Sequence, residues 1–456
     1  MDDNINKYKD KDKIIEKCIN ASYEYRRKLT ISMFNWKNTF YNLKDSVKYN
    51  LVNFNLKFNP QESTKVHFLY KKYNPSTEKG YKHYNNQLKK ILLMTYRSNY
   101  KEQTNIKNNM IYTSDCGWGC MIRSSQMIIA RMIYKIFKYI YKNIFTSDVI
   151  IKSIIPFFMD VNITMTSINI KSSDCIIIGM DHYLQQLNKL LEKKISDNGY
   201  KKLTIKAFDP PFSIHKICIL GEIFGRTCGE WFSDFELPKI YEIINTTFNI
   251  IPNLSILHFN SDIDMKLVIE NCFQKIENID EIPDFKPSNY FINEKNENYE
   301  FKKMGAIFVS VRLGVSSIQE DYFKSIKKLF ECKQFLGFMG GKINSASYFF
   351  GYSGENLLFL DPHYNQDSIT DLDEKNLMTY MDKIVYQLPF TSLQCAFTIG
   401  FLFRDLKEFR ELYVFFKTFM LEKLPCFHVQ IKQNKKDNNI SPEEIENNIN
   451  NELDDF

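Results

Sequence analysis

The chain of 456 residues predicts a protein of the α+β class, in which a long helix packs on a mostly antiparallel sheet. Residues 121–145 place apolar side chains near helical spacing, directly after a Gly-Trp-Gly turn. Short apolar runs at residues 306–311, 357–360 and 397–403 have the length and composition of buried strands. Residues 353–356 (Ser-Gly-Glu-Asn) join two apolar runs and are typical of a hairpin turn.

The predicted helix begins directly after Cys120. A thiol at a helix N-terminus feels the positive end of the helix dipole, which favours the reactive thiolate. Gly117 and Gly119 allow a sharp entry into the helix and a close approach of a substrate backbone. A cysteine in this position is in most proteins a small buried hydrophobe, so a nucleophilic role requires a base elsewhere in the chain.

A candidate base follows the predicted strand at residues 357–360, in the sequence Asp361-Pro362-His363. Residues two apart in an extended chain point to the same side, so Asp361 and His363 can face one site. Pro362 favours extended geometry for the residue before it. The sequence therefore predicts that Asp361 orients His363, and that His363 takes the proton of Cys120.

The remaining elements are predicted in chain order. Residues 1–65 form a partly disordered N-terminal extension, and residues 66–430 form the main domain. Two insertions are expected within that domain: a Lys/Ile-rich one near residues 146–205, with a helix near 183–194, and a mobile Glu/Asn/Lys-rich one near 275–303. Residues 317–320 resemble a capping box that opens a helix to about residue 332, and residues 406–421 form a further helix. Residues 431–456 are predicted to be a disordered acidic tail.

Composition excludes several classes of function. A net charge of +6 without a basic stripe does not favour nucleic-acid binding. The ten cysteines are scattered without a Cys-x-x-Cys pair, which argues against a zinc site, and no cofactor is expected. Cys116, four positions before Cys120, is interpreted as a spare thiol rather than a redox partner. The charged N-terminus and the lack of a long apolar run predict a cytoplasmic protein without a membrane span.

With both motifs in view, the chain resembles the autophagins, the papain-like cysteine peptidases of autophagy. The resemblance extends over roughly residues 66–403, and its most specific parts are residues 113–123 and 361–363. Weaker similarity, in the order of the family, occurs at residues 95–97, 211–216, 229–232, 311–314, 336–342 and 347–351.

The resemblance implies roles for further residues. Tyr96 matches the tyrosine of the oxyanion hole, and Trp231 matches the tryptophan that lines the substrate cleft. The other expected cleft residues lie in the nucleophile motif and in the predicted loop at residues 336–342: Trp118, Gly119, Gly340 and Gly341. Ile343 stands where the family tends to have a proline in the loop that gates the site.

The activity that the resemblance implies is cleavage after the C-terminal glycine of a ubiquitin-like autophagy modifier. It includes trimming of the precursor and removal of phosphatidylethanolamine from the conjugated form, with membrane contact through that lipidated substrate. Both leaving groups are amines, so one site can serve both reactions. The alternatives are a thiol peptidase acting on ubiquitin or another ubiquitin-like modifier, and a non-catalytic protein that binds the modifier.

Overall fold

The computed structural model describes residues 56–160, 210–277, 287–293, 297–314, 318–342, 345–369 and 373–430. The main sheet has nine strands, with β15-β13-β12-β11-β16-β10-β5 in order, β1 beside β12 and β2 beside β1. Every neighbouring pair is antiparallel except β10 and β5. The strands are β1 (Val66–Phe68), β2 (Lys71–Tyr73), β5 (Leu254–Asn260), β10 (Met304–Arg312), β11 (Phe335–Lys342), β12 (Ser345–Ser353), β13 (Asn356–Leu360), β15 (Tyr386–Pro389) and β16 (Ala396–Phe403).

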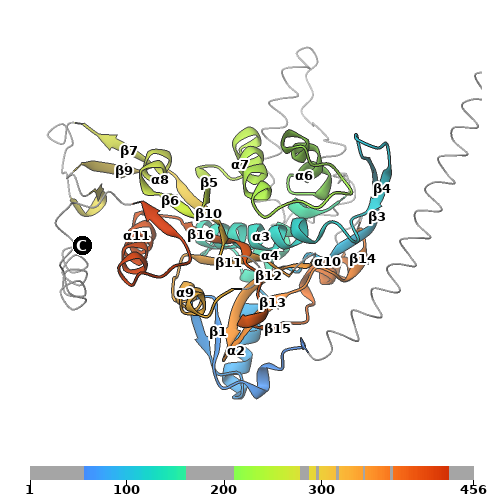
Figure 1. Ribbon diagram of the computed structural model, residues 1–456, viewed down its shortest axis with the longest axis horizontal. Helices are drawn as coiled ribbons and strands as arrows, with labels where there is room; N and C mark the ends of the chain where they lie inside the picture. Colours follow the sequence, from blue (N-terminus) through green and yellow to red (C-terminus); the bar gives the residue numbers. More distant parts are fainter. Residues whose placement is uncertain are drawn as a thin grey trace, which may run out of the picture.

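Three small sheets surround the main one (Figure 1). At one end of the molecule, β3 (Tyr96–Thr104) pairs with β4 (Ile111–Ser114) and with β14 (Asn365–Asp367). At the opposite end, β9 (Asn298–Phe301) lies between β7 (Phe273–Ile276) and β8 (Phe291–Ile292). The remaining pair joins β6 (Asp262–Asp264) to β17 (His428–Gln430).

Helix α3 (Cys120–Ile140) is the central helix, and it packs on β11 and β12. Sixteen of its residues are buried, and five of these are polar or charged: Arg123, Ser124, Ser125, Gln126 and Arg131. A helix buried to this extent is covered by other elements on most of its surface, and its buried polar side chains need hydrogen-bond partners there. The other α-helices are α2 (Glu78–Leu88), α4 (Ser147–Ile154), α6 (Ile214–Gly221), α7 (Glu236–Phe248), α8 (Met265–Cys272), α9 (Asp321–Leu329), α10 (Glu374–Met381) and α11 (Leu406–Leu421).

The α+β class with a mostly antiparallel sheet is confirmed, as are the predicted elements that place the site. The long helix begins at Cys120 and ends at Ile140. The strands expected near residues 306–311, 347–352, 357–360 and 397–403 are β10, β12, β13 and β16. The expected hairpin joins β12 to β13 across Gly354, whose φ of 56° is one that glycine adopts without strain.

Two local predictions were wrong. Residues 336–342 form most of strand β11 rather than a loop, because Gly337 and Gly340 adopt φ of 104° and 141° and keep pairing with the neighbouring strands. The helix expected from residue 317 begins at Asp321, and its N-cap Glu320 makes no side-chain capping bond.

Parts of the predicted extension and insertions form regular structure. Phe58, near the end of the extension, is buried. Helix α4 and the short 3-10 helix at residues 155–158 bury apolar side chains beside α3, because their Ile and Phe residues complete its covering. In the second insertion, Phe291 packs on Phe409 of α11, as does Phe273 just before the insertion. The helix expected near residues 183–194 and the tail at 431–456 lie outside the described residues.

Among the helices of the described part, none combines the length and the apolar character needed to cross a bilayer.

Candidate active site

Cys120 is the first residue of α3, and only 7% of it is exposed. The preceding turn follows from the glycines: Gly117 has a φ of 87°, and Gly119 is the N-cap of the helix. No helical carbonyl can accept the backbone N–H groups of the first turn, so these donors and the helix dipole face the sulfur region. The thiol thus lies where negative charge is stabilised.

Asp361 and His363 follow the end of β13 at Leu360. The Nδ1 atom of His363 lies 2.6 Å from Oδ1 of Asp361, and the backbone N–H of His363 donates to the same oxygen at 2.9 Å. The carboxylate therefore holds both the ring and the backbone of the histidine. A proton on Nδ1 leaves Nε2 as the ring nitrogen that can take or give a proton.

The topology brings this segment to Cys120. Strand β14, which follows His363, pairs in parallel with β3, and the N–H of Tyr96 donates to the carbonyl of Pro362 at 2.9 Å. The side chains of Cys120 and His363 face each other and interact, although more than two hundred residues separate them in sequence.

The electrostatics of the pair favour charge separation. Burial raises the pKa of the Cys120 thiol, but the hydrogen bond and charge of His363 outweigh this effect, and the pKa lies below its ordinary value. Burial lowers the pKa of His363, but the charge and hydrogen bond of Asp361, together with Cys120, raise it to about 10. The arrangement therefore supports a thiolate beside an imidazolium, which is the reactive form of a cysteine nucleophile.

Tyr96 is buried at the start of β3, and its ring stands edge-on to His363 with centroids 5.4 Å apart. Burial raises the pKa of its hydroxyl well above the ordinary value, as does the nearby Cys120, so the hydroxyl remains a donor. Its hydrogen bond to Cys120 helps to lower the pKa of the thiol. A hydroxyl that points at the nucleophile is placed to donate to an oxyanion formed there.

The two tryptophans expected at the cleft have different environments. Trp231 is 51% exposed, and its Nε1–H donates to the carbonyl of Gly117 at 2.8 Å, so the ring lies beside the turn that precedes Cys120. Trp118 is 5% exposed, donates to the carbonyl of Ser114 at 3.0 Å and packs edge-on against Tyr112. The surroundings of Trp118 are those of a core residue.

The expected cleft glycines also differ. A Cβ on Gly119 would lie 2.4 Å from the carboxylate of Asp115, and a Cβ on Gly340 would lie 2.7 Å from Phe397. Both positions therefore need glycine for packing inside the protein. The backbone of Gly341 lies opposite Ala346 in the β11–β12 pair. Ile343, in the expected gating loop, lies outside the described residues.

Cys116 is half-buried and packs against the small apolar cluster of Tyr96, Cys120 and Ala346. The eight cysteines in the described part of the chain are thiols rather than disulfides. Within that same part, no three His, Cys, Asp or Glu side chains gather where they could hold a metal ion.

Sequence reasoning missed two features of the site. The backbone N–H of Ala346 donates to the Cys120 sulfur and lowers its pKa, and only the β11–β12 register places that amide there. Asp115 and Arg123 form an ion pair at 2.7 Å under the first turn of α3. The opposite charges of Asp115 and Arg123 on either side of Cys120, next to a long apolar run, were the signal available for this second feature.

Comparison with known proteins gives consistent matches. The model of the peptidase C54 catalytic domain matches residues 81–414. Cysteine protease ATG4B of Xenopus laevis is 26% identical over 336 residues, which cover 69% of this chain and 68% of that protein. ATG4B of Gallus gallus is 25% identical over 346 residues, covering 72% and 73%, and ATG4A of Mus musculus is 25% identical over 316 residues, covering 65% of each. The matched segments thus span about two thirds of the length of these relatives.

Proposed function

Since this chain belongs to the peptidase C54 family and is a cysteine protease, we propose that it hydrolyses the bond after the C-terminal glycine of an Atg8-family ubiquitin-like modifier. The observation that carries the proposal is the series Asp361–His363–Cys120: Asp361 is hydrogen-bonded to His363, and both His363 and Tyr96 lie beside the Cys120 sulfur and lower its pKa. The same site acts on the precursor and on the modifier conjugated to phosphatidylethanolamine, because the leaving group is an amine in both.

The Cys120 thiolate attacks the carbonyl carbon of the glycine, and a C–S bond forms. The Tyr96 hydroxyl and the backbone N–H of Cys120 donate to the resulting oxyanion, an effect worth about 3–4 kcal/mol for a donor in a dry site. The imidazolium of His363 protonates the leaving amine as the C–N bond breaks. Neutral His363 then takes a proton from water, which hydrolyses the thioester, and Asp361 keeps the ring oriented throughout.

Trp231 supports the specificity for glycine. Its exposed ring is hydrogen-bonded to the turn that precedes Cys120. A substrate backbone that reaches Cys120 passes alongside this ring and the turn, so the residue before the cleaved bond must lack a bulky side chain. The lipidated substrate brings the enzyme to a membrane surface, and its thiols fit a reducing compartment such as the cytoplasm.

The test is incubation of the purified chain with a tagged Atg8-family precursor and with its lipidated form, beside the Cys120→Ala variant. Cleavage of both substrates by the wild type and of neither by the variant is expected, while the variant keeps binding the modifier. Cleavage by Cys120→Ala would refute the assignment. A parallel panel of ubiquitin and other ubiquitin-like precursors tests the alternative substrate. Efficient cleavage of one of these precursors, without cleavage of the Atg8-family substrates, would show that the enzyme acts on a different modifier.

A further inference from the structure

We propose that Asp115 is a positioning residue that fixes the Tyr96 hydroxyl relative to the Cys120 sulfur. The inference rests on the proposed function, because it assigns Asp115 a role through the nucleophile and the oxyanion donor. Asp115 itself stands beneath the reacting groups, bonded to the two chain segments that present them.

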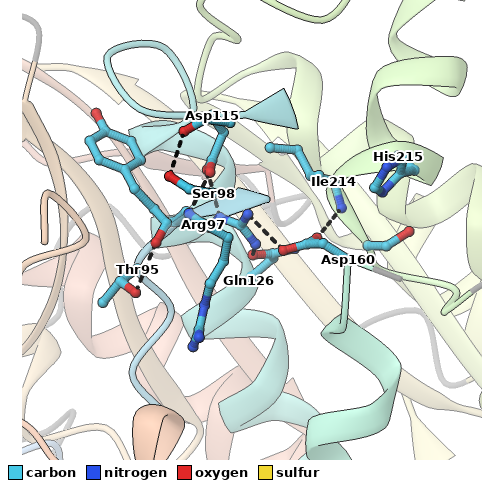
Figure 2. Close-up of polar contacts among 12 residues, drawn as sticks. Thr95, Arg97, Ser98, Asp115, Gln126, Asp160, Ile214 and His215 are labelled. Carbon is cyan, nitrogen blue, oxygen red and sulfur yellow. Dashed lines mark hydrogen bonds and ion pairs between the residues drawn. The ribbon is translucent and has the colours of Figure 1, made fainter. Parts of the chain in front are cut away.

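Asp115 belongs to a cluster of charges that is cut off from solvent. Nε of Arg123 lies 2.7 Å from Oδ2 of Asp115, and NH2 of Arg123 lies 2.8 Å from Oδ2 of Asp160. The three side chains are 1%, 0% and 1% exposed, respectively. The amide of Gln126 accepts a further hydrogen bond from Arg123 at 3.1 Å. Figure 2 shows the cluster between β3 and the segment that leads into Ile214.

Stability alone does not account for such a cluster. Moving ions out of water costs several kcal/mol per ion, and apolar residues of similar volume are often as stabilising as a buried ion pair. What an ion pair adds is fixed geometry, since each oxygen and each N–H has one partner in one direction. The informative question is therefore which groups the cluster holds in place.

Asp115 joins the segments that carry Tyr96 and Cys120. Its Oδ1 accepts the backbone N–H of Arg97 at 2.6 Å, and its own N–H donates to the carbonyl of Arg97 at 3.2 Å. Its carbonyl accepts the N–H of Gly119 at 2.8 Å. Arg97 directly follows Tyr96, and Gly119 directly precedes Cys120. One residue thus holds both neighbours of the reacting pair.

The close fit at Gly119 makes this link stiff. A Cβ at Gly119 would lie 2.4 Å from Oδ2 of Asp115, so the carboxylate rests directly against the backbone at the helix N-cap. Arg123 neutralises the charge at this point. An unpaired carboxylate beneath Cys120 would oppose formation of the thiolate, whereas the ion pair holds the geometry without that electrostatic penalty.

The test is a double-mutant cycle with Asp115→Asn and Tyr96→Phe, measured on the Atg8-family precursor. Asparagine has one acceptor oxygen, so it can keep the bond from the Arg97 N–H or the bond from Arg123, but not both. The expected result is a 10- to 100-fold loss of kcat in Asp115→Asn with KM within about twofold, because small misplacements of catalytic groups have effects of this size. In the Tyr96→Phe background, the same substitution should lower kcat by less than about threefold.

Asp160→Asn is the matched control. It removes a carboxylate from the same arginine, and its amide oxygen can still accept the N–H of Ile214, which Asp160 accepts at 3.0 Å. Among the described residues, its carboxylate bonds to Arg123 and to the N–H of Ile214, and neither residue is a chain neighbour of Tyr96 or Cys120. The kcat should therefore stay within about threefold at a similar loss of unfolding free energy. Equal losses of kcat in Asp115→Asn and Asp160→Asn, or additive effects in the cycle, would overturn the proposal.

A substrate-free readout separates this proposal from the function. The rate of alkylation of Cys120 by iodoacetamide, followed by mass spectrometry of its peptide, should move to higher pH in Asp115→Asn, since Tyr96 helps to lower the pKa of the thiol. If the wild type cleaves no modifier, the function is refuted, and this profile still tests the positioning role. If Asp115→Asn does not fold, Arg123→Lys replaces it in the double-mutant cycle and in the alkylation assay. The expected loss of kcat is then smaller, and its effect should again be non-additive with that of Tyr96→Phe.

Discussion

Replacement of Asp361 by asparagine removes a charge from the site and keeps the size of the side chain. In the structure, one oxygen of Asp361 accepts both the Nδ1–H and the backbone N–H of His363, at 2.6 and 2.9 Å. The carbonyl oxygen of an asparagine can accept both of these bonds. The flipped amide is disfavoured, because it would point the NH2 group at the N–H donors of His363, where it finds no acceptor. The substitution should therefore preserve the tautomer and remove the support of a charge for the imidazolium.

The magnitude follows from that difference. A hydrogen bond to a charged group contributes roughly 1.5–3 kcal/mol. At about 1.4 kcal/mol for each factor of ten in rate, the expected loss of kcat is roughly 10- to 150-fold. Inversion of the tautomer would cost much more, about 10⁴-fold, as in serine proteases that carry the same substitution.

The assay combines kcat on the precursor with the pH dependence of Cys120 alkylation. Asp361 raises the pKa of His363, and His363 lowers the pKa of Cys120. Loss of the carboxylate should thus move the alkylation profile to higher pH, toward that of an ordinary thiol. Asp367→Asn is the control, because Asp367 is an exposed carboxylate in the adjacent strand β14. A kcat within twofold of wild type, or an unchanged alkylation profile, would refute this reasoning.

Three further outcomes are expected. In the wild type, a group with a lowered pKa stays ionised as the pH falls, so the midpoint of the Cys120 alkylation profile should lie below the pKa of an ordinary thiol, about 8.5; a midpoint at or above 8.5 would contradict the ion pair. Trp231→Phe keeps an aromatic ring but loses the hydrogen bond to the Gly117 carbonyl, so kcat/KM should fall several-fold with an unchanged melting temperature. A large loss of thermal stability would instead show that the ring has a structural role. Ile128→Ala in α3 should cost about 2–5 kcal/mol of unfolding free energy in urea titrations, because Ile128 is fully buried; a cost below 1 kcal/mol would mean that the core closes around the gap.

The local elements could be predicted from the sequence because each depends on neighbours in the chain. The spacing of apolar residues after Cys120 indicated α3, and the turn residues 353–356 between two apolar runs indicated the β12–β13 hairpin. The prediction failed at residues 336–342, where the family resemblance implied a loop. The glycines there belong to a crowded strand: a Cβ at Gly337 would lie 2.4 Å from the Phe349 carbonyl. No local pattern records such cross-strand contacts.

The arrangement of Asp361 and His363 was also local, since two residues on one side of an extended segment can meet without help from the fold. By itself the sequence indicated a candidate nucleophile at a helix N-terminus and a candidate acid–base pair after a strand. Tertiary structure decided that they meet: the pairing of β14 with β3 brings His363 to Tyr96 and Cys120, and the β11–β12 register brings the amide of Ala346. These contacts join segments far apart in the chain, and only the packing of α3 on the sheet fixes their distances.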